Sequence, residues 1–181
     1  MKKTVRIAHL LAVAVGLATT AALAQQLPEG YTCCNLHYDK DWISDANWRT
    51  LPMIPAGAKI KVLEYGWNRA GVEIDGKPMR IGQDYGRKEE SLQAYVAKLV
   101  VKDDPKARIA KYPPKVKQAI HDGVVIQGMT RDQVIIAVGY PPTHRTVTLD
   151  SNVWNLWASR AGRYEVHFNS KGTVERLVGE K

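Results

Sequence analysis

The fold of the first half is decided by one stretch, Val72-Glu73-Ile74-Asp75-Gly76-Lys77-Pro78-Met79-Arg80-Ile81. Apolar and polar residues alternate on both sides of its Asp-Gly pair, which predicts two strands that each bury one face. Asp-Gly between such strands favours a hairpin, because primed turns need positive φ and glycine adopts it without steric cost. The stretch 58–62 alternates in the same way after the turn at 55–57. We therefore expect 50–86 to form a small antiparallel sheet or barrel.

A covering helix is predicted next, from about Lys88 to Val101. Its apolar residues recur every three or four positions and form one stripe, with acidic residues in the first turn to suit the helix dipole. The stripe consists of Leu92, Tyr95, Val96, Leu99 and Val100. The acidic, proline-marked stretch 103–105 then marks a seam between two halves.

The second half begins with helix signals and ends with strand signals. A helix is expected to start at Pro113-Pro114 and to end at Gly123. Thr130 and Gln133 fit a capping box at the start of the next helix, and Gly139 ends it. Alternating apolar residues after 150 predict an antiparallel meander. The fold class is thus α+β, with a β-rich domain at 25–102 and a helix-helix-sheet domain at 103–181. We expect the two halves to pack together, since each is small for an independent core.

The N-terminal segment 1–24 has the pattern of a cleaved signal peptide. Positive residues precede a short apolar stretch, and Ala22-Leu23-Ala24 fits a cleavage site before Gln25. The apolar stretch is shorter than the roughly 20 residues that span a bilayer. We therefore predict a periplasmic protein with no transmembrane segment in its mature form, with association with the outer membrane left open.

Composition narrows the class of protein and of partner. The 181 residues are 45% apolar and 24% charged, which excludes a disordered tail, a collagen-like fibre and a polytopic membrane protein. Lys and Arg number 26 against 18 acidic residues, for a net charge of +8. These basic residues are scattered, so no nucleic-acid partner is predicted. An acidic protein face or an anionic envelope surface fits the charge better.

A pattern of residues runs through the second half: Gly128, Met129, Thr130, Gln133, Gly139, Pro141, Trp154 and Phe168. On these residues, the second half resembles the BamE (SmpA/OmlA) domain. This resemblance implies two helices against a three-stranded antiparallel sheet, and a role in outer-membrane protein assembly or envelope integrity. The chain departs from that family because it has no lipidation cysteine and carries an additional N-terminal half. That half resembles a bacterial SH3-like barrel at 54–57, which implies peptide or cell-wall binding.

The most unusual local feature is Cys33-Cys34-Asn35-Leu36-His37. Adjacent thiols near an imidazole suit a soft metal such as Cu(I), or a redox pair. Two thiols and one histidine are too few for a closed zinc site. Oxidising conditions favour a disulfide, within the chain or between chains, although a bond between sequence neighbours closes a strained eight-membered ring. A metal-handling or thiol-redox protein centred on Cys33 and Cys34 is therefore the alternative function.

Catalysis is not predicted. No Gly-x-Ser-x-Gly elbow, His-Glu-x-x-His helix or glycine-rich phosphate loop is present, and no cofactor or resident metal is implied. Tryptophans and tyrosines gather instead in the first half, near Arg80 and Arg87. They either fill the core or form an aromatic, basic surface for a peptide or glycan, with Trp42, Trp67 and Arg69 as the leading residues. We thus expect a non-catalytic interaction protein of the cell envelope.

Overall fold

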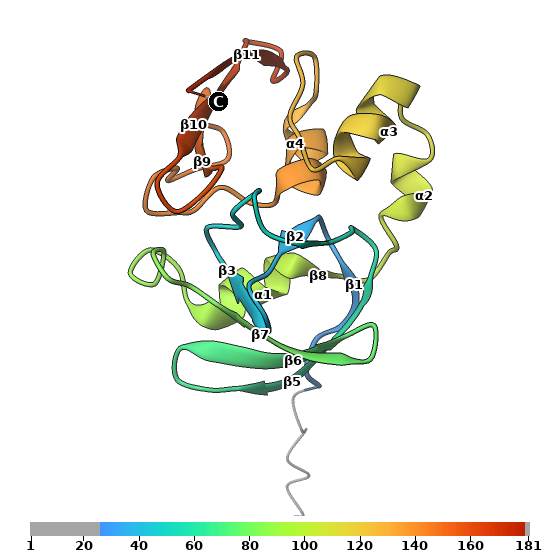
Figure 1. Cartoon of the computed structure of the whole chain (residues 1–181), viewed down its shortest axis with the longest axis vertical. Helices are drawn as coiled ribbons and strands as arrows, with labels where there is room; N and C mark the ends of the chain where they lie inside the picture. The colour runs from blue at the N-terminus through green and yellow to red at the C-terminus, as the bar shows by residue number, and fades with distance from the viewer. Residues whose placement is uncertain (1–25, 180–181) are drawn as a thin grey trace, which may run out of the picture.

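The computed structural model describes residues 26–179. The predicted signal peptide and its cleavage site, Ala24-Gln25, lie outside these residues. Figure 1 shows one half built around a curled sheet and helix α1, and the other built from helices α2 to α4 beside a small sheet. The predicted α+β fold class is confirmed by this combination of helices and sheets. No helix in the described part of the chain is long and apolar enough to cross a membrane.

The first half is a six-stranded sheet in the order β3-β7-β6-β5-β1-β8. The Asp75-Gly76 hairpin between β6 and β7 is confirmed, since both residues have positive φ (47° and 76°). The sheet is not purely antiparallel as predicted, because β3 pairs with β7 in parallel. A parallel pair needs a long connection, and residues 45–76 supply it. The strands are β1 Glu29–Thr32, β3 Trp42–Ser44, β5 Lys59–Tyr65, β6 Arg69–Ile74, β7 Lys77–Gly82 and β8 Val100–Val101.

Helix α1 spans Leu92–Leu99 and contacts β6 and β7. Its predicted apolar stripe is buried, apart from Val100 at its end. The predicted start at Lys88 is wrong, because Ser91 is the N-cap and its hydroxyl accepts a hydrogen bond from the Ala94 N–H at 3.2 Å. The predicted end at Val101 is also wrong, since Val100 and Val101 leave the helix to pair with β1.

The second half contains α2 (Lys106–Ile109), α3 (Pro114–His121) and α4 (Arg131–Val138), followed by β9 (Val153–Trp157), β10 (Arg163–Phe168) and β11 (Val174–Val178). The three strands form an antiparallel meander, β11-β10-β9, as predicted. The capping box is confirmed, because Thr130 and Gln133 exchange side-chain and backbone hydrogen bonds. Gly139 ends α4 with a φ of 81°.

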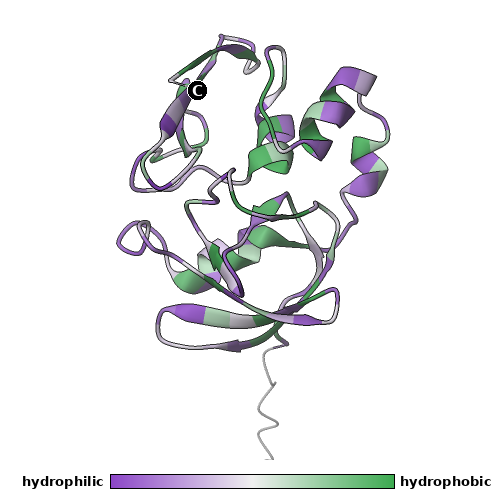
Figure 2. Ribbon diagram, in the orientation of Figure 1, coloured by the Kyte–Doolittle hydropathy of each residue, from purple (hydrophilic) through white to green (hydrophobic). Residues whose placement is uncertain are grey.

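Each half has its own apolar core, and the apolar segments turn inward in both (Figure 2). Trp154 and Phe168 meet edge to face in the second core, with ring centroids 4.7 Å apart. The cores are not isolated from each other. Ala56, in the turn before β5, is buried in the second core, and Ile135 of α4 packs against both.

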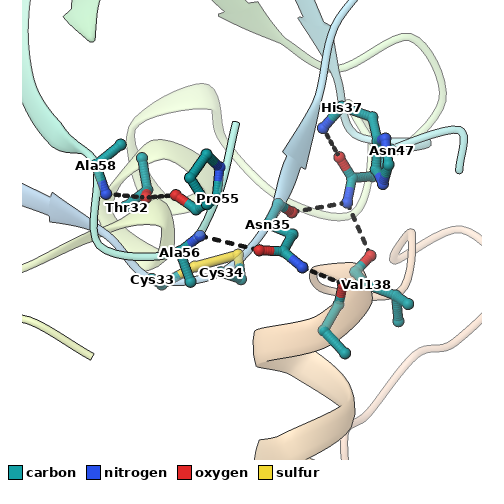
Figure 3. Close-up of a disulfide and its surroundings, with 11 residues drawn as sticks. Thr32, Cys33, Cys34, Asn35, His37, Asn47, Pro55, Ala56, Ala58 and Val138 are labelled. Carbon is teal, nitrogen blue, oxygen red and sulfur yellow. Dashed lines mark hydrogen bonds between the residues drawn. A yellow bond between two sulfur atoms is a disulfide. The ribbon is translucent and has the colours of Figure 1, made fainter. Parts of the chain in front are cut away.

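Asn35 links the first half to two helices of the second, and Figure 3 shows its contacts with Ala56 and with α4. Its buried amide donates to the carbonyl of Ile120 at 2.6 Å and to that of Ala137 at 2.9 Å. Its side-chain oxygen accepts from the Ala56 N–H at 2.9 Å. The last carbonyls of a helix have no partner within the helix, so Asn35 satisfies such groups in α3 and α4 at once.

Asn47 reinforces the same seam (Figure 3). Its amide donates to the carbonyls of Val138 at 2.8 Å and of Asn35 at 3.1 Å, and its oxygen accepts from the His37 N–H at 2.7 Å. A Cβ at Gly139 would lie 2.6 Å from the Asn47 amide nitrogen. The close approach of α4 to the first half therefore needs glycine at 139. The expected packing of the two halves is present.

Candidate functional site

A cluster of aromatic and basic side chains lies on the outer face of the curled sheet. Met79 and Ile81 of β7 point into the core, so Arg80 and Gly82 face outward. The strand register places Trp42 of β3 opposite Arg80, and Arg69 of β6 opposite Gly82. Residues that are far apart in the sequence thus meet on one face.

Trp42 is the centre of this cluster. The guanidinium carbons of Arg69 and Arg80 lie 5.8 Å and 5.9 Å from the centroid of its ring, within the range of cation–π attraction. The indole N–H donates to Oδ2 of Asp84 at 3.1 Å. The ring is therefore fixed in orientation while it stays partly exposed.

Arg80 is held by a carboxylate. Its Nε and Nη2 donate to the two oxygens of Asp41 at 2.6 Å and 2.7 Å, a bidentate pair. The hydrogen bond from Arg80 lowers the pKa of Asp41, and the same bond raises the pKa of Arg80. Because Arg80 is neutralised by Asp41, its role is to position Trp42 rather than to bind a free anion.

The cluster surrounds a hollow of about 300 Å³. Arg69 and Arg87, on its rim, form no salt bridge among residues 26–179, although Asp41 attracts Arg69 at longer range and Asp84 lines the same hollow. The hollow therefore places three arginines against the one carboxylate of its lining, Asp84, beside an aromatic ring, a combination that suits an anionic ligand with apolar parts. We call it the Trp42 surface; it is lined by Trp42, Asn68, Arg69, Arg80, Gln83, Asp84 and Arg87.

Trp67 stands next to this surface, at the tip of the β5–β6 hairpin. It is 94% exposed, whereas Trp48 is buried with 7% exposed. The turn is closed by the Gly66 N–H, which donates to the Arg69 carbonyl at 2.8 Å. Large exposed aromatic residues are typical of binding surfaces. The structure thus places Trp42, Trp67 and Arg69 on neighbouring parts of one sheet.

Gly82 lets the indole lie against the sheet. A Cβ at this position would overlap the far edge of the Trp42 ring and would lie 2.8 Å from the Asn68 carbonyl oxygen. Any side chain here would displace Trp42. Sequence reasoning missed this residue, since its importance appears only when β3 is placed beside β7.

Asp45 shapes the loop that forms one wall of the hollow. Its buried carboxylate accepts from the N–H groups of Asp84 at 2.8 Å and of Gly86 at 2.7 Å. Burial raises the pKa of Asp45, while these backbone hydrogen bonds oppose the rise. The loop stacks Tyr85 against two rings of the second half, with its centroid 5.4 Å from that of His144 and 5.8 Å from that of Trp157. The Trp42 surface is thereby connected to the second half, a link that sequence reasoning also missed.

The two cysteines form a disulfide within the chain (Figure 3). Both are buried, and Cys34 is 0% exposed. In this form neither sulfur is a thiolate, which is the form that binds Cu(I). The described residues contain no group of three or more His, Cys, Asp or Glu side chains placed to hold a metal. The alternative function centred on Cys33 and Cys34 stays a prediction.

The residues that carry the BamE resemblance lie at or next to the ends of α4, or are buried. Thr130, Gln133 and Gly139 start and end α4, and Gly128 precedes it with a φ of 88°. The remaining four, Met129, Pro141, Trp154 and Phe168, are buried. Comparisons with protein-family models, with curated proteins and with solved structures find no match to this chain.

Proposed function

We propose that this chain is a non-catalytic interaction protein of the cell envelope, and that it binds an acidic segment of a partner protein. The observation that carries the proposal is the exposure of Trp67 beside the Trp42 surface, where Arg69 and Arg87 form no salt bridge with the other described residues. Trp and Arg are the residues that most often dominate binding energy at interfaces. The proposed compartment is the periplasm, which follows from the predicted signal peptide.

The chemistry of the surface favours an acidic segment with an apolar or aromatic side chain. Arg69 can donate two parallel hydrogen bonds to a carboxylate, because its contacts with Trp42 and Asn68 leave donors unused. Trp67 offers a large apolar area with few rotatable bonds, so ordering it on binding costs little entropy. A partner segment with a carboxylate and an apolar side chain a few residues apart would contact both Arg69 and Trp67.

The class of partner is proposed from the second half. The pairing of α3 with α4 beside the antiparallel sheet β9–β11 supports the BamE-like arrangement that the resemblance implies. We therefore propose components of outer-membrane protein assembly, or other proteins that maintain the envelope, as the first partners to test. The curled sheet of the first half supports the SH3-like part of the proposal, in which that half binds peptides.

Affinity capture tests this function. The immobilised protein is incubated with an envelope extract of a Gram-negative bacterium, in parallel with Trp42→Ala/Trp67→Ala and with Val147→Ala. Val147 is a matched control, because it is 87% exposed and lies in the second half. We expect the wild type and Val147→Ala to retain the same acidic envelope protein, and the double variant to lose it while its unfolding remains cooperative. Equal retention by all three proteins would contradict the proposal.

A further inference from the structure

His37 and Met53 lie side by side on the two-stranded sheet at the seam. This sheet pairs β2 (Leu36–His37) with β4 (Met53–Ile54), and the register places His37 directly opposite Met53. Both side chains reach Gly123, just after α3. A Cβ on Gly123 would lie 3.0 Å from the Met53 sulfur and 3.7 Å from Nε2 of His37. The two donor atoms therefore face the same point, and the absence of a side chain at 123 leaves that point open.

The imidazole of His37 is oriented as a ligand. Its Nδ1 lies 2.8 Å from the Leu51 carbonyl oxygen, which can only accept, so Nδ1 carries the proton and Nε2 presents a lone pair. Nε2 is buried and has no hydrogen-bond partner within the described residues, and His37 as a whole is 4% exposed. Burial also lowers the pKa of His37, which keeps the ring neutral. Metal-binding histidines typically donate their second N–H to a carbonyl in this way.

We propose that His37 Nε2 and Met53 Sδ form a binding site for one soft monovalent cation, Cu(I) or Ag(I). A thioether selects soft ions, and an imidazole nitrogen is a suitable second donor. Hard ions such as Mg²⁺ and Ca²⁺ require oxygen ligands. This site differs from the one predicted at Cys33 and Cys34, because it needs no free thiol.

The site is not fully closed to solvent, because Met53 is only partly buried. Met53 lines a groove of about 500 Å³ on the surface of the first half. Met79 also lines this groove, although its side chain is mostly buried in the first core. It provides a control methionine, because Val72 and not a histidine lies opposite it in the strand register.

Titration with Ag(I) tests the site without a reductant, so the disulfide remains intact. The purified chain carries ¹³C-labelled methionine methyl groups, assigned by single Met→Leu substitutions, and ¹⁵N-labelled histidine, in which His37 is assigned by His37→Gln. We expect one equivalent of Ag(I) to shift the Met53 methyl signal and the His37 Nε2 signal, while Met79 and Met129 remain unchanged. Met53→Leu should weaken Ag(I) binding by about tenfold or more, and Met79→Leu should leave it unchanged.

Each other outcome overturns the inference. If no signal moves at one equivalent of Ag(I), the unpartnered nitrogen of His37 belongs to a dry or water-filled space. A shift of Met79 alone would place the ion in the groove without the histidine. The test is independent of the proposed function, because Trp67→Ala should bind Ag(I) as the wild type does.

Discussion

Replacing Asn35 with alanine should loosen the two halves more than any surface substitution does. Asn35→Ala removes three buried hydrogen bonds, of 2.6, 2.9 and 2.9 Å, and leaves their partners Ile120, Ala137 and Ala56 without this amide. A buried polar group left unpaired costs about 1–3 kcal/mol. We use about 1 kcal/mol for each of the three groups, the low end of this range, because the Ile120 carbonyl also accepts a hydrogen bond from the Gly123 N–H. The expected loss of unfolding free energy is then about 3 kcal/mol in total.

The assay is urea unfolding followed by near-ultraviolet circular dichroism, with a thermal melt in parallel. For a chain of this size, a loss of about 3 kcal/mol lowers Tm by roughly 6–12 °C. Gln93→Ala is the control, because it removes an exposed amide from α1 and should change the unfolding free energy by less than about 0.5 kcal/mol. If Asn35→Ala unfolds at the same urea concentration as Gln93→Ala, the seam is not held by this amide and the reasoning is refuted.

Three further predictions follow from the geometry. Gly82→Ala should displace Trp42 and abolish partner capture, with an unfolding cost of about 1–3 kcal/mol; capture equal to wild type would show that the ring position is unimportant. Burial lowers the pKa of His37 below its ordinary value of 6.5, so the unfolding free energy should fall as the pH drops below 6.5, where only the unfolded chain takes up that proton. His37→Gln should remove this part of the pH dependence, and an unchanged slope in urea titrations at pH 7 and pH 5 would contradict it. The non-reduced protein should resist alkylation at Cys33 and Cys34, and peptide mass mapping should find them joined; two alkylated thiols would contradict the disulfide.

Features governed by local rules could be predicted from the sequence. The Asp75-Gly76 hairpin, the Thr130 capping box and the glycine at the end of α4 each depend on a few neighbouring residues. Backbone sterics and hydrogen-bond geometry act over that short range. The boundaries of α1 were harder, because Val100 and Val101 leave the helix to pair with β1, nearly seventy residues earlier in the chain.

Features that depend on pairing between distant segments could not be predicted. Strand β3 pairs with β7, and Asn35 bonds to Ile120 and Ala137, which are all distant from them in the sequence. Neighbouring residues therefore do not indicate either the parallel pair or the seam. The sequence singles out Trp42 and Trp67 but leaves open whether the tryptophans of the first half fill the core or form a surface; in the structure Trp48 is buried and Trp67 is almost fully exposed. His37 was grouped with the cysteines by proximity in sequence, whereas the strand register places it opposite Met53.

The most direct test of the proposed binding surface is site-specific photo-crosslinking. A photoreactive phenylalanine analogue is placed at position 67 or, as a control, at the exposed position 147 of the second half, in Gram-negative cells that produce the protein. We expect one adduct of defined mass from position 67, none from position 147, and loss of the adduct when Arg69→Glu reverses the charge beside it. Adducts of equal yield from both positions, or an adduct at 67 that is indifferent to Arg69→Glu, would contradict the claim that Trp67 and Arg69 hold an acidic partner.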